Sequence, residues 1–282
     1  MKIIHTIKAL NEQLADVKYK ALVPTMGNLH EGHLRLMDAA HSKSQLHKGI
    51  SIATVFVNRL QFGPHEDFDR YPRTLENDCA LLEKRGCDLV FAPDESELYP
   101  EPQTYKVSPP PDLANILEGH FRPGFFTGVC TVVMKLFSLV QPQCAIFGKK
   151  DYQQLMIIKK MVKQFNLPID VMGLETLRAD DGLALSSRNG YLSLEERLKA
   201  VELYQSIQHI AQLIKAQATD GMELCQASEK RLKGAGWAVD YISLCHQSDL
   251  SPCTPSSKDN LVVLAAAKIG QTRLIDNIEI NF

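Results

Sequence analysis

Two histidines three residues apart, His30 and His33, are the side chains whose type and spacing most directly suggest chemistry. They close the stretch ALVPTMGNLHEGH, residues 21–33, which begins as a short apolar run and leads into a good helix former. This pattern predicts a strand, a turn at Gly27 and a helix. In an α/β protein such a turn lies at the carboxyl end of a strand, where the helix N-terminus binds anions. Two imidazoles there suit a polyphosphate whose charge grows as a bond breaks.

Three other interpretations of this stretch stay open from its residues alone. The two histidines could simply cap and decorate a helix start, which explains the stretch about equally well. The letters HEGH are one residue short of the H-E-x-x-H zinc motif, and no third ligand is obvious, so a metal site is disfavoured. Gly27 and Gly32 do not complete G-x-G-x-x-G, so a dinucleotide-binding loop is only weakly indicated.

Apolar runs that alternate with helical segments indicate the elements that must position these residues. Residues 49–57, GISIATVFV, have the continuous apolar character of a strand buried on both faces of a parallel sheet. The alternation predicts an α/β fold with a Rossmann-like parallel sheet and right-handed crossovers. The remaining segments follow from the same patterns: strands near 87–92, 144–147 and 169–172, and helices near 3–14, 34–44, 74–85 (capped by Thr74), 129–140 and 152–165.

Polar residues follow two of the predicted buried strands, at the edge where such folds keep their ligand contacts. Asn58 and Gln61 follow the strand at 49–57, although by themselves they would be taken for an ordinary polar loop. Residues 148–151, Gly-Lys-Lys-Asp, follow a second strand and open the helix that carries Gln154. A lysine there can reach phosphates as a point charge, whereas an aspartate in this position is most often a helix cap.

The pattern changes from Ser193 onward. Two amphipathic helices near 193–217 and 220–234 precede residues 237–245, a loop, and strands near 261–267 and 272–280, which predicts a smaller C-terminal α/β domain of helices and an antiparallel sheet. The loop before them, residues 181–189, offers two hydroxyls and a guanidinium to a polyphosphate, or is merely a linker before a helix capped by Ser193. We place the domains at 1–175 and 176–282.

Composition excludes several classes of function. The chain has 282 residues and a net charge of −2, so it carries no basic footprint for nucleic acid. No apolar stretch is long enough to span a bilayer, and the N-terminus lacks the apolar core of a signal peptide. The seven cysteines form no CxxC pair, which favours reduced, mostly buried thiols in a cytoplasmic protein.

Taken together, the motifs of the chain resemble the pantothenate synthetase (pantoate–β-alanine ligase) family, relatives of the class I aminoacyl-tRNA synthetases and other HIGH-motif nucleotidylyltransferases. The resemblance covers nearly the whole chain, and seven motifs in order make it very specific. The motifs are PTMGNLHEGH (24–33), FVNRLQF (56–62), RYPRTLENDC (70–79), LEGHFRPGFFTGV (117–129), FGKKDYQQL (147–155), DGLALSSRNGYL (181–192) and RLIDN (273–277).

The resemblance implies an enzyme that uses ATP to condense pantoate with β-alanine through a pantoyl-adenylate, releasing AMP and pyrophosphate. It implies His33 as a proton donor, His30 beside it, and Lys150 on phosphate, with Asp151 nearer the ribose. It places Gln61, Gln154 and Asn58 on substrate and, more weakly, Asp78 at magnesium. The residues that it places on ATP are Met26, Gly27, Asn28, Leu29, His30, Glu31, Gly32, His33, Gly148, Lys149, Lys150, Asp151, Leu177, Leu185, Ser186, Ser187 and Arg188.

The sequence departs from the family pattern at three positions. Arg59 stands where family members usually have proline, Phe125 where many have histidine, and Asn77 where some have an acid. None of these touches His30, His33, Gln61, Lys150, Gln154 or Arg188, so an active enzyme is expected. The resemblance further implies ATP and Mg²⁺ as substrate and cofactor, pantoate and β-alanine as the other small molecules, and a homodimer, with no nucleic acid or membrane as partner.

Two rival functions are weighed against this one. A nucleotidylyltransferase acting on a phosphate or a different acid would carry other residues in place of the paired glutamines, Gln61 and Gln154. A non-catalytic nucleotide-binding regulator would be expected to have lost a histidine or Lys150, and the sequence retains them.

Overall fold

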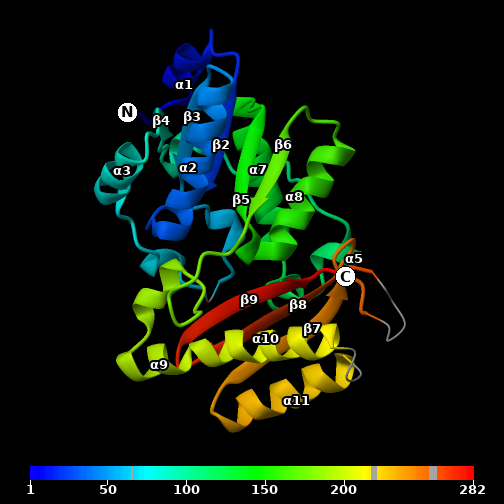
Figure 1. The fold of residues 1–282 in the computed structure, drawn as a ribbon. Helices are drawn as coiled ribbons and strands as arrows, with labels where there is room; N and C mark the ends of the chain where they lie inside the picture. Colours follow the sequence, from blue (N-terminus) through cyan, green and yellow to red (C-terminus); the bar gives the residue numbers. More distant parts are fainter. Residues whose placement is uncertain (65, 217–220, 254–258) are drawn as a thin grey trace. The chain divides into compact units, whose positions relative to one another are not determined.

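The computed structural model describes residues 1–64, 66–216, 221–253 and 259–282, which form two compact units (Figure 1). The first unit comprises residues 1–149 and 154–175, and the second comprises residues 150–153 and 176–282. The first contains a six-stranded parallel sheet with helices, and the second contains a three-stranded antiparallel sheet with helices. The predicted fold class, a Rossmann-like parallel sheet followed by a smaller α/β domain, is confirmed.

The strands of the first unit lie in the order β1-β4-β3-β2-β5-β6. Going outward from β2, the chain adds β3 and β4 on one side and β5 and β6 on the other, so the strand order reverses between β2 and β5. The carboxyl ends of strands at such a switch point are where open α/β sheets bind ligands. The strands are β1 (Lys2–Ile4), β2 (Lys20–Thr25), β3 (Ile50–Val55), β4 (Leu89–Phe91), β5 (Cys144–Gly148) and β6 (Asp170–Leu174).

Helices and short 3₁₀ turns connect these strands. The helices are α1 (Ile7–Leu14), α2 (Glu31–Leu46), α3 (Leu75–Lys84), α4 (Glu95–Leu98), α5 (Pro111–Ala114), α6 (Glu118–Phe121), α7 (Phe125–Val140) and α8 (Tyr152–Gln164), and the 3₁₀ turns are η1 (Arg59–Gln61), η2 (Phe68–Arg70) and η3 (Lys149–Asp151). Strand residues alternate between the faces of the sheet, and one face, with Ala21, Val23 and Ala53, packs on Leu34 and Met37 of α2.

Three local predictions for the first unit need correction. Ile3 and Ile4, predicted as the start of a helix, instead form β1 and pair with β4, because even three residues can extend the sheet edge. Thr74 precedes α3 but its side chain does not cap it, since its hydroxyl donates to Asp78 instead. The helix predicted from residue 129 begins four residues earlier, at Phe125, as α7.

In the second unit, helix α10 covers the antiparallel sheet β7-β8-β9. Ile207 and Ile210 of α10 pack with Val263 and Ala265 of β8, and each of these side chains is almost fully buried. The helix predicted over 193–217 is two helices that meet at Ala200, and residues 217–220 lie outside the described part. The elements are η4 (Ser187–Tyr191), α9 (Leu194–Lys199), α10 (Val201–Lys215), α11 (Gly221–Gly234), β7 (Ala238–His246), β8 (Leu261–Ile269) and β9 (Thr272–Ile280).

The start of α9 shows how local sequence fixes an element of this unit. Ser193 Oγ accepts a hydrogen bond from the backbone amide of Glu196, and the Glu196 carboxylate accepts one from the amide of Ser193. This reciprocal capping box satisfies two helix-start donors, so the suggestion that Ser193 caps a helix is confirmed.

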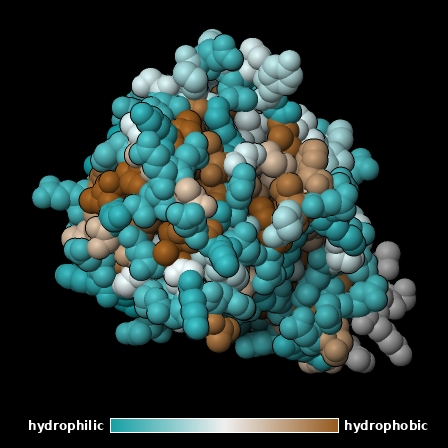
Figure 2. Space-filling model, turned by 90° about the horizontal axis from the view of Figure 1, so that it is seen from above, coloured by the Kyte–Doolittle hydropathy of each residue, from teal (hydrophilic) through white to brown (hydrophobic). Residues whose placement is uncertain are grey.

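The cysteines agree with the prediction of reduced, mostly buried thiols. Six of the seven cysteines are buried, Cys253 is half-buried, and none forms a disulfide. Figure 2 shows a face on which hydrophobic residues lie in several areas between hydrophilic ones. Among the helices in the described residues, none combines the length and the apolar character needed to span a bilayer.

Candidate functional site

The turn between β2 and α2 lies at the switch point of the parallel sheet and is held in an uncommon backbone conformation. Gly27 has φ +81° and Asn28 has φ +50°, both in the left-handed region. Glycine adopts this region without steric cost and asparagine tolerates it. The Thr25 hydroxyl accepts a hydrogen bond from the Gly27 amide at 3.2 Å and donates one to the Thr54 carbonyl at 2.6 Å. The turn is thereby tied to the ends of both β2 and β3.

His30 and His33 together form the cap of α2. His30 is the N-cap residue, and its Nδ1 accepts from the Gly32 amide at 3.1 Å, while His33 Nδ1 accepts from the His30 amide at 3.4 Å. The ring centroids lie 4.1 Å apart. An amide can donate only to an unprotonated ring nitrogen, so in both neutral rings the proton lies on Nε2. Each ring therefore has an N–H donor on the side away from the cap.

Asp78 of α3 accepts hydrogen bonds from the backbone of this turn. Its Oδ2 accepts from the Asn28 amide at 2.9 Å, its Oδ1 accepts from the Leu29 amide at 2.8 Å, and the Thr74 hydroxyl donates to Oδ2 at 3.1 Å. The side chain is fully buried. The carboxylate therefore binds two successive amides of the turn that the sequence singled out.

Asn58 and Gln61 form the second part of the site in the first unit. The Asn58 amide group donates to Gln61 Oε1 at 3.0 Å and to the Gly128 carbonyl at 3.1 Å. Its oxygen accepts from the Tyr99 hydroxyl at 3.0 Å, and Asn58 is only 1% exposed. Gln61 Nε2 in turn donates to Met26 Sδ at 3.1 Å. Asn58 thus holds the Gln61 amide, and Gln61 faces the turn at Met26.

Tyr99 and Gly128 belong to this network although the sequence did not single them out. Burial, with a smaller contribution from the charge of Glu95, raises the pKa of Tyr99 well above its usual value, so its hydroxyl stays a donor to Asn58. A Cβ on Gly128 would overlap the Leu60 carbonyl oxygen and lie 2.7 Å from the Gln61 amide nitrogen. Glycine in the FTGV motif is the one local signal that could have indicated this close approach.

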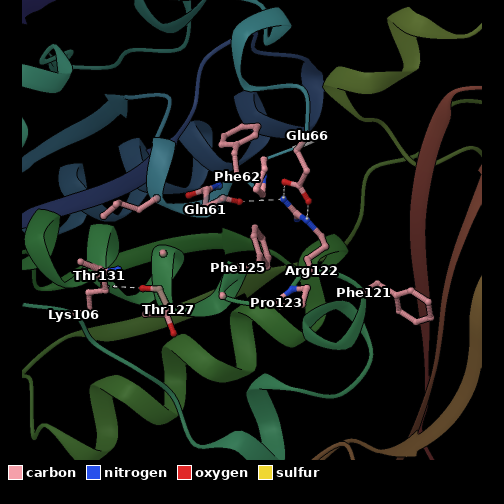
Figure 3. A pocket seen from close by; sticks show the side chains of 15 residues that line it. Gln61, Phe62, Glu66, Lys106, Phe121, Arg122, Pro123, Phe125, Thr127 and Thr131 are labelled. Carbon is pink, nitrogen blue, oxygen red and sulfur yellow. Dashed lines mark hydrogen bonds and ion pairs between the residues drawn. The ribbon is translucent and has the colours of Figure 1, made fainter. Parts of the chain in front are cut away.

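A cavity of about 570 Å³ borders the loop that carries Gln61 (Figure 3). Arg122 extends along it, with two 2.6 Å contacts from its guanidinium to the Glu66 carboxylate and a 3.2 Å hydrogen bond to the Gln61 carbonyl. The guanidinium lies 3.7 Å from the centre of the Phe125 ring. Phe125, one of the departures from the family pattern, therefore supplies a flat surface for Arg122. These contacts brace the Gln61 loop from the cavity side.

Arg59, the second departure, points to the protein surface. Its Nε donates to Glu95 at 3.0 Å and its guanidinium lies 3.9 Å from the centre of the Phe68 ring. Its side chain is 56% exposed, so the pair with Glu95 contributes little to stability.

The turn after β5 carries the next group of predicted residues. Gly148 ends β5, Lys149 pairs with Glu175, and Lys150 and Asp151 complete the 3₁₀ turn η3. Gln154 follows in the first turn of α8 and is half-buried. Within the second unit, Asn277 Nδ2 donates to the Lys150 carbonyl at 2.9 Å. The motif at 273–277 thus helps to fix the backbone of a predicted phosphate-binding lysine.

The predicted loop of the second unit is a tight hairpin-like turn. The Leu185 amide donates to the Leu177 carbonyl at 2.9 Å, which brings these two predicted ATP-binding residues together. Ser186 caps η4 by accepting from the Arg188 amide at 3.3 Å, and Ser187 and Arg188 lie within η4. The cap and the 3₁₀ turn therefore give Ser186, Ser187 and Arg188 a defined backbone conformation.

Arg178 holds this turn to strand β9. It makes two hydrogen bonds to the Asp276 carboxylate, at 2.6 and 2.8 Å, and its guanidinium lies 3.8 Å from the centre of the Tyr204 ring. It also donates to the Gly182 carbonyl at 3.2 Å. Neither Arg178 nor Asp276 was predicted as a site residue, although Arg178 follows Leu177 and Asp276 lies within the motif at 273–277.

The hydrogen bonds of Asp78 bear on its predicted role as a magnesium ligand. Mg²⁺ in nucleotide sites keeps several waters and takes one or two carboxylates in addition to phosphates. Asp78 does not fit that description, because it is fully buried and both of its oxygens are bound by turn amides. Across the parts of the chain that the structure describes, no three His, Cys, Asp or Glu side chains gather into a metal-binding group.

The structure thus groups the predicted residues into two sets. The first unit brings together the turn at 26–33, Asn58, Gln61 and Asp78. The second unit brings together Leu177 and the segment 185–188.

Comparisons with known proteins agree with this architecture. A family model described as pantoate-beta-alanine ligase matches residues 2–279. A pantothenate synthetase of Leptothrix cholodnii is 56% identical, over 99% of this chain and 100% of that protein. The crystal structure of pantothenate synthetase from Thermus thermophilus has a TM-score of 0.92 and 42% identity, with 100% of both chains covered.

A crystal structure of pantoate-beta-alanine ligase from Francisella tularensis, complexed with beta-gamma ATP and beta-alanine, is similar at a TM-score of 0.78. It is 31% identical and covers 99% of this chain and 97% of its own. The family model and the relatives span the whole fold described above, the turn and the Gln61 loop included. The chain belongs to the pantoate–β-alanine ligase family.

Proposed function

We propose that this protein joins pantoate to β-alanine at the expense of ATP, through a pantoyl-adenylate. A pantoate carboxylate oxygen attacks the α-phosphorus of ATP, the bond to the β-phosphate oxygen breaks, and pyrophosphate leaves. The β-alanine amine then attacks the acyl carbon, AMP leaves with the bonding electrons, and the amine loses a proton. Adenylation is needed because a carboxylate is a poor electrophile, whereas AMP is a good leaving group.

The observation that carries this proposal is the paired histidine cap at the switch point of the sheet. His30 and His33 use Nδ1 for the helix cap, so their Nε2–H groups serve as donors to an anion at the N-terminus of α2. Donors that are fixed before the reaction stabilise charge as it develops on departing pyrophosphate. Support also comes from the Francisella tularensis relative, whose crystal structure is complexed with beta-gamma ATP and beta-alanine.

Gln61 and Gln154 are proposed to bind pantoate, with Asn58 holding Gln61 in place. An amide can donate to a carboxylate or accept from a hydroxyl without adding charge beside the nucleophile. The hydrogen bonds of Gln61 to Asn58 and Met26 fix its amide beside the turn. Asn58, whose amide hydrogens are both engaged within the protein, acts on substrate through Gln61.

The nucleotide is proposed to contact two further segments. Lys150 neutralises phosphate charge, Asp151 lies nearer the ribose, and residues 185–188 bind the polyphosphate through two hydroxyls and a guanidinium. Leu177 offers its backbone to adenine. We retain residues 1–175 as the ATP- and pantoate-binding domain and residues 176–282 as a lid, together with magnesium on ATP, a homodimer and a cytoplasmic location, as predictions.

The experiment that tests the function is isotope exchange between pyrophosphate and ATP. Purified protein is assayed with magnesium, with and without pantoate, and without β-alanine. We expect exchange only when pantoate is present, because the reversible step that regenerates ATP needs the acyl-adenylate. Exchange with a different acid and not with pantoate would identify another ligase, and ATP binding without any exchange would favour a nucleotide-binding regulator.

A further inference from the structure

The structure assigns Asp78 a positioning role: it holds the nucleotide-binding turn in its left-handed conformation and does not serve as a ligand for magnesium. This inference rests on the function proposed above, because it concerns how the turn at 26–33 is prepared for ATP. Asp78 lies on α3, outside the turn, and reaches it from 49 and 50 residues away in sequence.

The contacts of Asp78 divide its two oxygens between two consecutive amides. Oδ1 accepts from Leu29 at 2.8 Å, and Oδ2 accepts from Asn28 at 2.9 Å. These amides precede the cap residue of α2, so no helical carbonyl is available to them. Without the carboxylate, the buried Leu29 amide and the half-buried Asn28 amide would lose these hydrogen bonds, which is costly for a buried donor.

Backbone conformation explains why the carboxylate is needed. Two consecutive residues, Gly27 and Asn28, have positive φ, and contacts with the surroundings stabilise this less common conformation at the asparagine, which has a side chain. The Gly27 Cα also lies close to the carboxylate, since a Cβ on it would stand 3.0 Å from Asp78 Oδ2. The Asp78 carboxylate is therefore packed directly against the strained turn.

The burial of Asp78 and the hydrogen bonds that its oxygens already accept argue against a metal at this carboxylate. Asp78 is 0% exposed and accepts a third hydrogen bond, from the Thr74 hydroxyl at 3.1 Å. A magnesium ligand has to present an oxygen to an ion that keeps its waters. The charge of Asp78 is instead met by amide and hydroxyl donors.

Asp78→Asn separates the two roles, because asparagine has the same shape but replaces one acceptor with a donor that would face an amide. The dissociation constant of ATP is measured by calorimetry twice, with magnesium and with EDTA, alongside the melting temperature. A positioning role predicts weakening of on the order of tenfold or more in both conditions, since the turn is displaced in both. By Coulomb attraction alone, loss of a negative charge would strengthen ATP binding, so weakening reports geometry.

Asp88→Asn is the matched control. Asp88 also accepts from a backbone amide of this unit, that of Ser51 at 2.8 Å, and from the Ser51 hydroxyl at 2.7 Å, but it lies at the start of β4. This variant should lower the melting temperature without changing ATP affinity. A loss of ATP affinity in Asp78→Asn that is present with magnesium and absent in EDTA would overturn the inference, as would unchanged affinity in both conditions.

Thr74→Val gives a second test if Asp78→Asn does not fold. It keeps the shape of the side chain and removes only the hydroxyl that donates to Asp78 Oδ2. We expect a smaller weakening of ATP binding, equal with magnesium and with EDTA, and no change would overturn the inference. Failure of the wild-type protein to bind ATP or to catalyse exchange would instead contradict the proposed function.

Discussion

Leu60 lies directly against Gly128, so that a Cβ on Gly128 would overlap the Leu60 carbonyl oxygen and stand 2.7 Å from the Gln61 amide nitrogen. The Gly128 carbonyl also accepts a hydrogen bond from Asn58. Helix α7 and the η1 loop can approach this closely only because residue 128 has no side chain. This contact sets the position of Gln61, the proposed pantoate ligand.

Gly128→Ala is therefore expected to move the η1 loop away from α7 and to raise KM for pantoate at least tenfold, since a displacement of about 1 Å in a positioned group can lower rates by a factor of about 100. The melting temperature should also fall, because overpacking costs about 1–3 kcal/mol. Pantoate-dependent exchange and thermal unfolding measure the two effects.

Gly234→Ala is the control for this prediction. Gly234 ends α11, and a Cβ added to it would have no neighbouring atom within 4 Å. Its substitution should leave KM for pantoate unchanged. If Gly128→Ala also leaves KM unchanged, then the loop does not depend on this contact.

Some features of this site could be predicted from the sequence, and others could not. The strand–turn–helix at 20–46 could be predicted because apolar runs, glycine and helix formers are local signals. The partners Arg122 and Glu66, 56 residues apart, leave no local pattern, and neither do Asp78 and its turn amides. The resemblance pointed to the acid at 78 as a magnesium residue, whereas its contacts with the turn amides could not be read from the sequence.

Short elements show a second limit. Strand β1 has three residues, and only pairing with β4 distinguishes it from the start of α1. Likewise, Thr74 has the residue type of a cap, yet its hydroxyl serves Asp78. In both places tertiary contacts override the local preference.

The dual use of His30 as cap and phosphate donor can be separated by two substitutions. His30→Asn keeps an acceptor for the Gly32 amide, because asparagine is a preferred N-cap, whereas His30→Ala removes it. We expect the alanine variant to be less stable by about 1 kcal/mol than the asparagine variant. Both variants should lose about 100-fold or more in exchange rate, since both lack the Nε2–H donor.

Equilibrium unfolding and pyrophosphate exchange provide these two readouts for the His30 variants. Normal exchange by His30→Asn would mean that the ring is only a cap, which is the interpretation that the residues of the turn left open. His33→Ala provides the comparison, with a similar loss of exchange expected from the loss of its Nε2–H donor.

The ion pair of Arg178 and Asp276 should be necessary for the stability of the second unit. The Asp276 side chain is only 4% exposed, and breaking a buried ion pair from one side costs about 3–5 kcal/mol because the other charge is left without its partner. Asp276→Ala is therefore expected to lower stability by that amount and to raise KM for ATP, because Arg178 also fixes the Gly182 carbonyl beside the 185–188 segment.

Arg197→Ala is the control for the Asp276 substitution. Arg197 pairs with Asp181 at 2.6 Å, but their side chains are 32% and 43% exposed, so the loss should be below about 1 kcal/mol. Denaturant unfolding distinguishes the two variants. Equal losses would show that burial does not govern the Arg178 pair.

The raised pKa values of the buried thiols predict that the protein loses stability at alkaline pH. Burial raises the pKa of Cys87, Cys130 and Cys245 to about 12 each, from an ordinary value near 9. Below pH 9 these thiols are protonated in both the folded and the unfolded state, and their contribution is fully present. Between about pH 9 and 12 only the unfolded state releases the protons, so stability falls by about 1 kcal/mol per thiol per pH unit.

The measurement is the free energy of unfolding from denaturant titrations between about pH 7 and pH 10.5, a range that covers the ionisation of unfolded thiols. Replacing Cys87 with alanine should reduce the alkaline slope by at most about a third, because one of the three most strongly raised thiols is then absent while Cys79 and Cys144, whose pKa values burial also raises, remain. Replacing the half-buried Cys253 with alanine should leave that slope unchanged. Stability that stays constant up to about pH 10.5 would contradict the assignment, because thiols that ionise equally in both states make no contribution to the pH dependence.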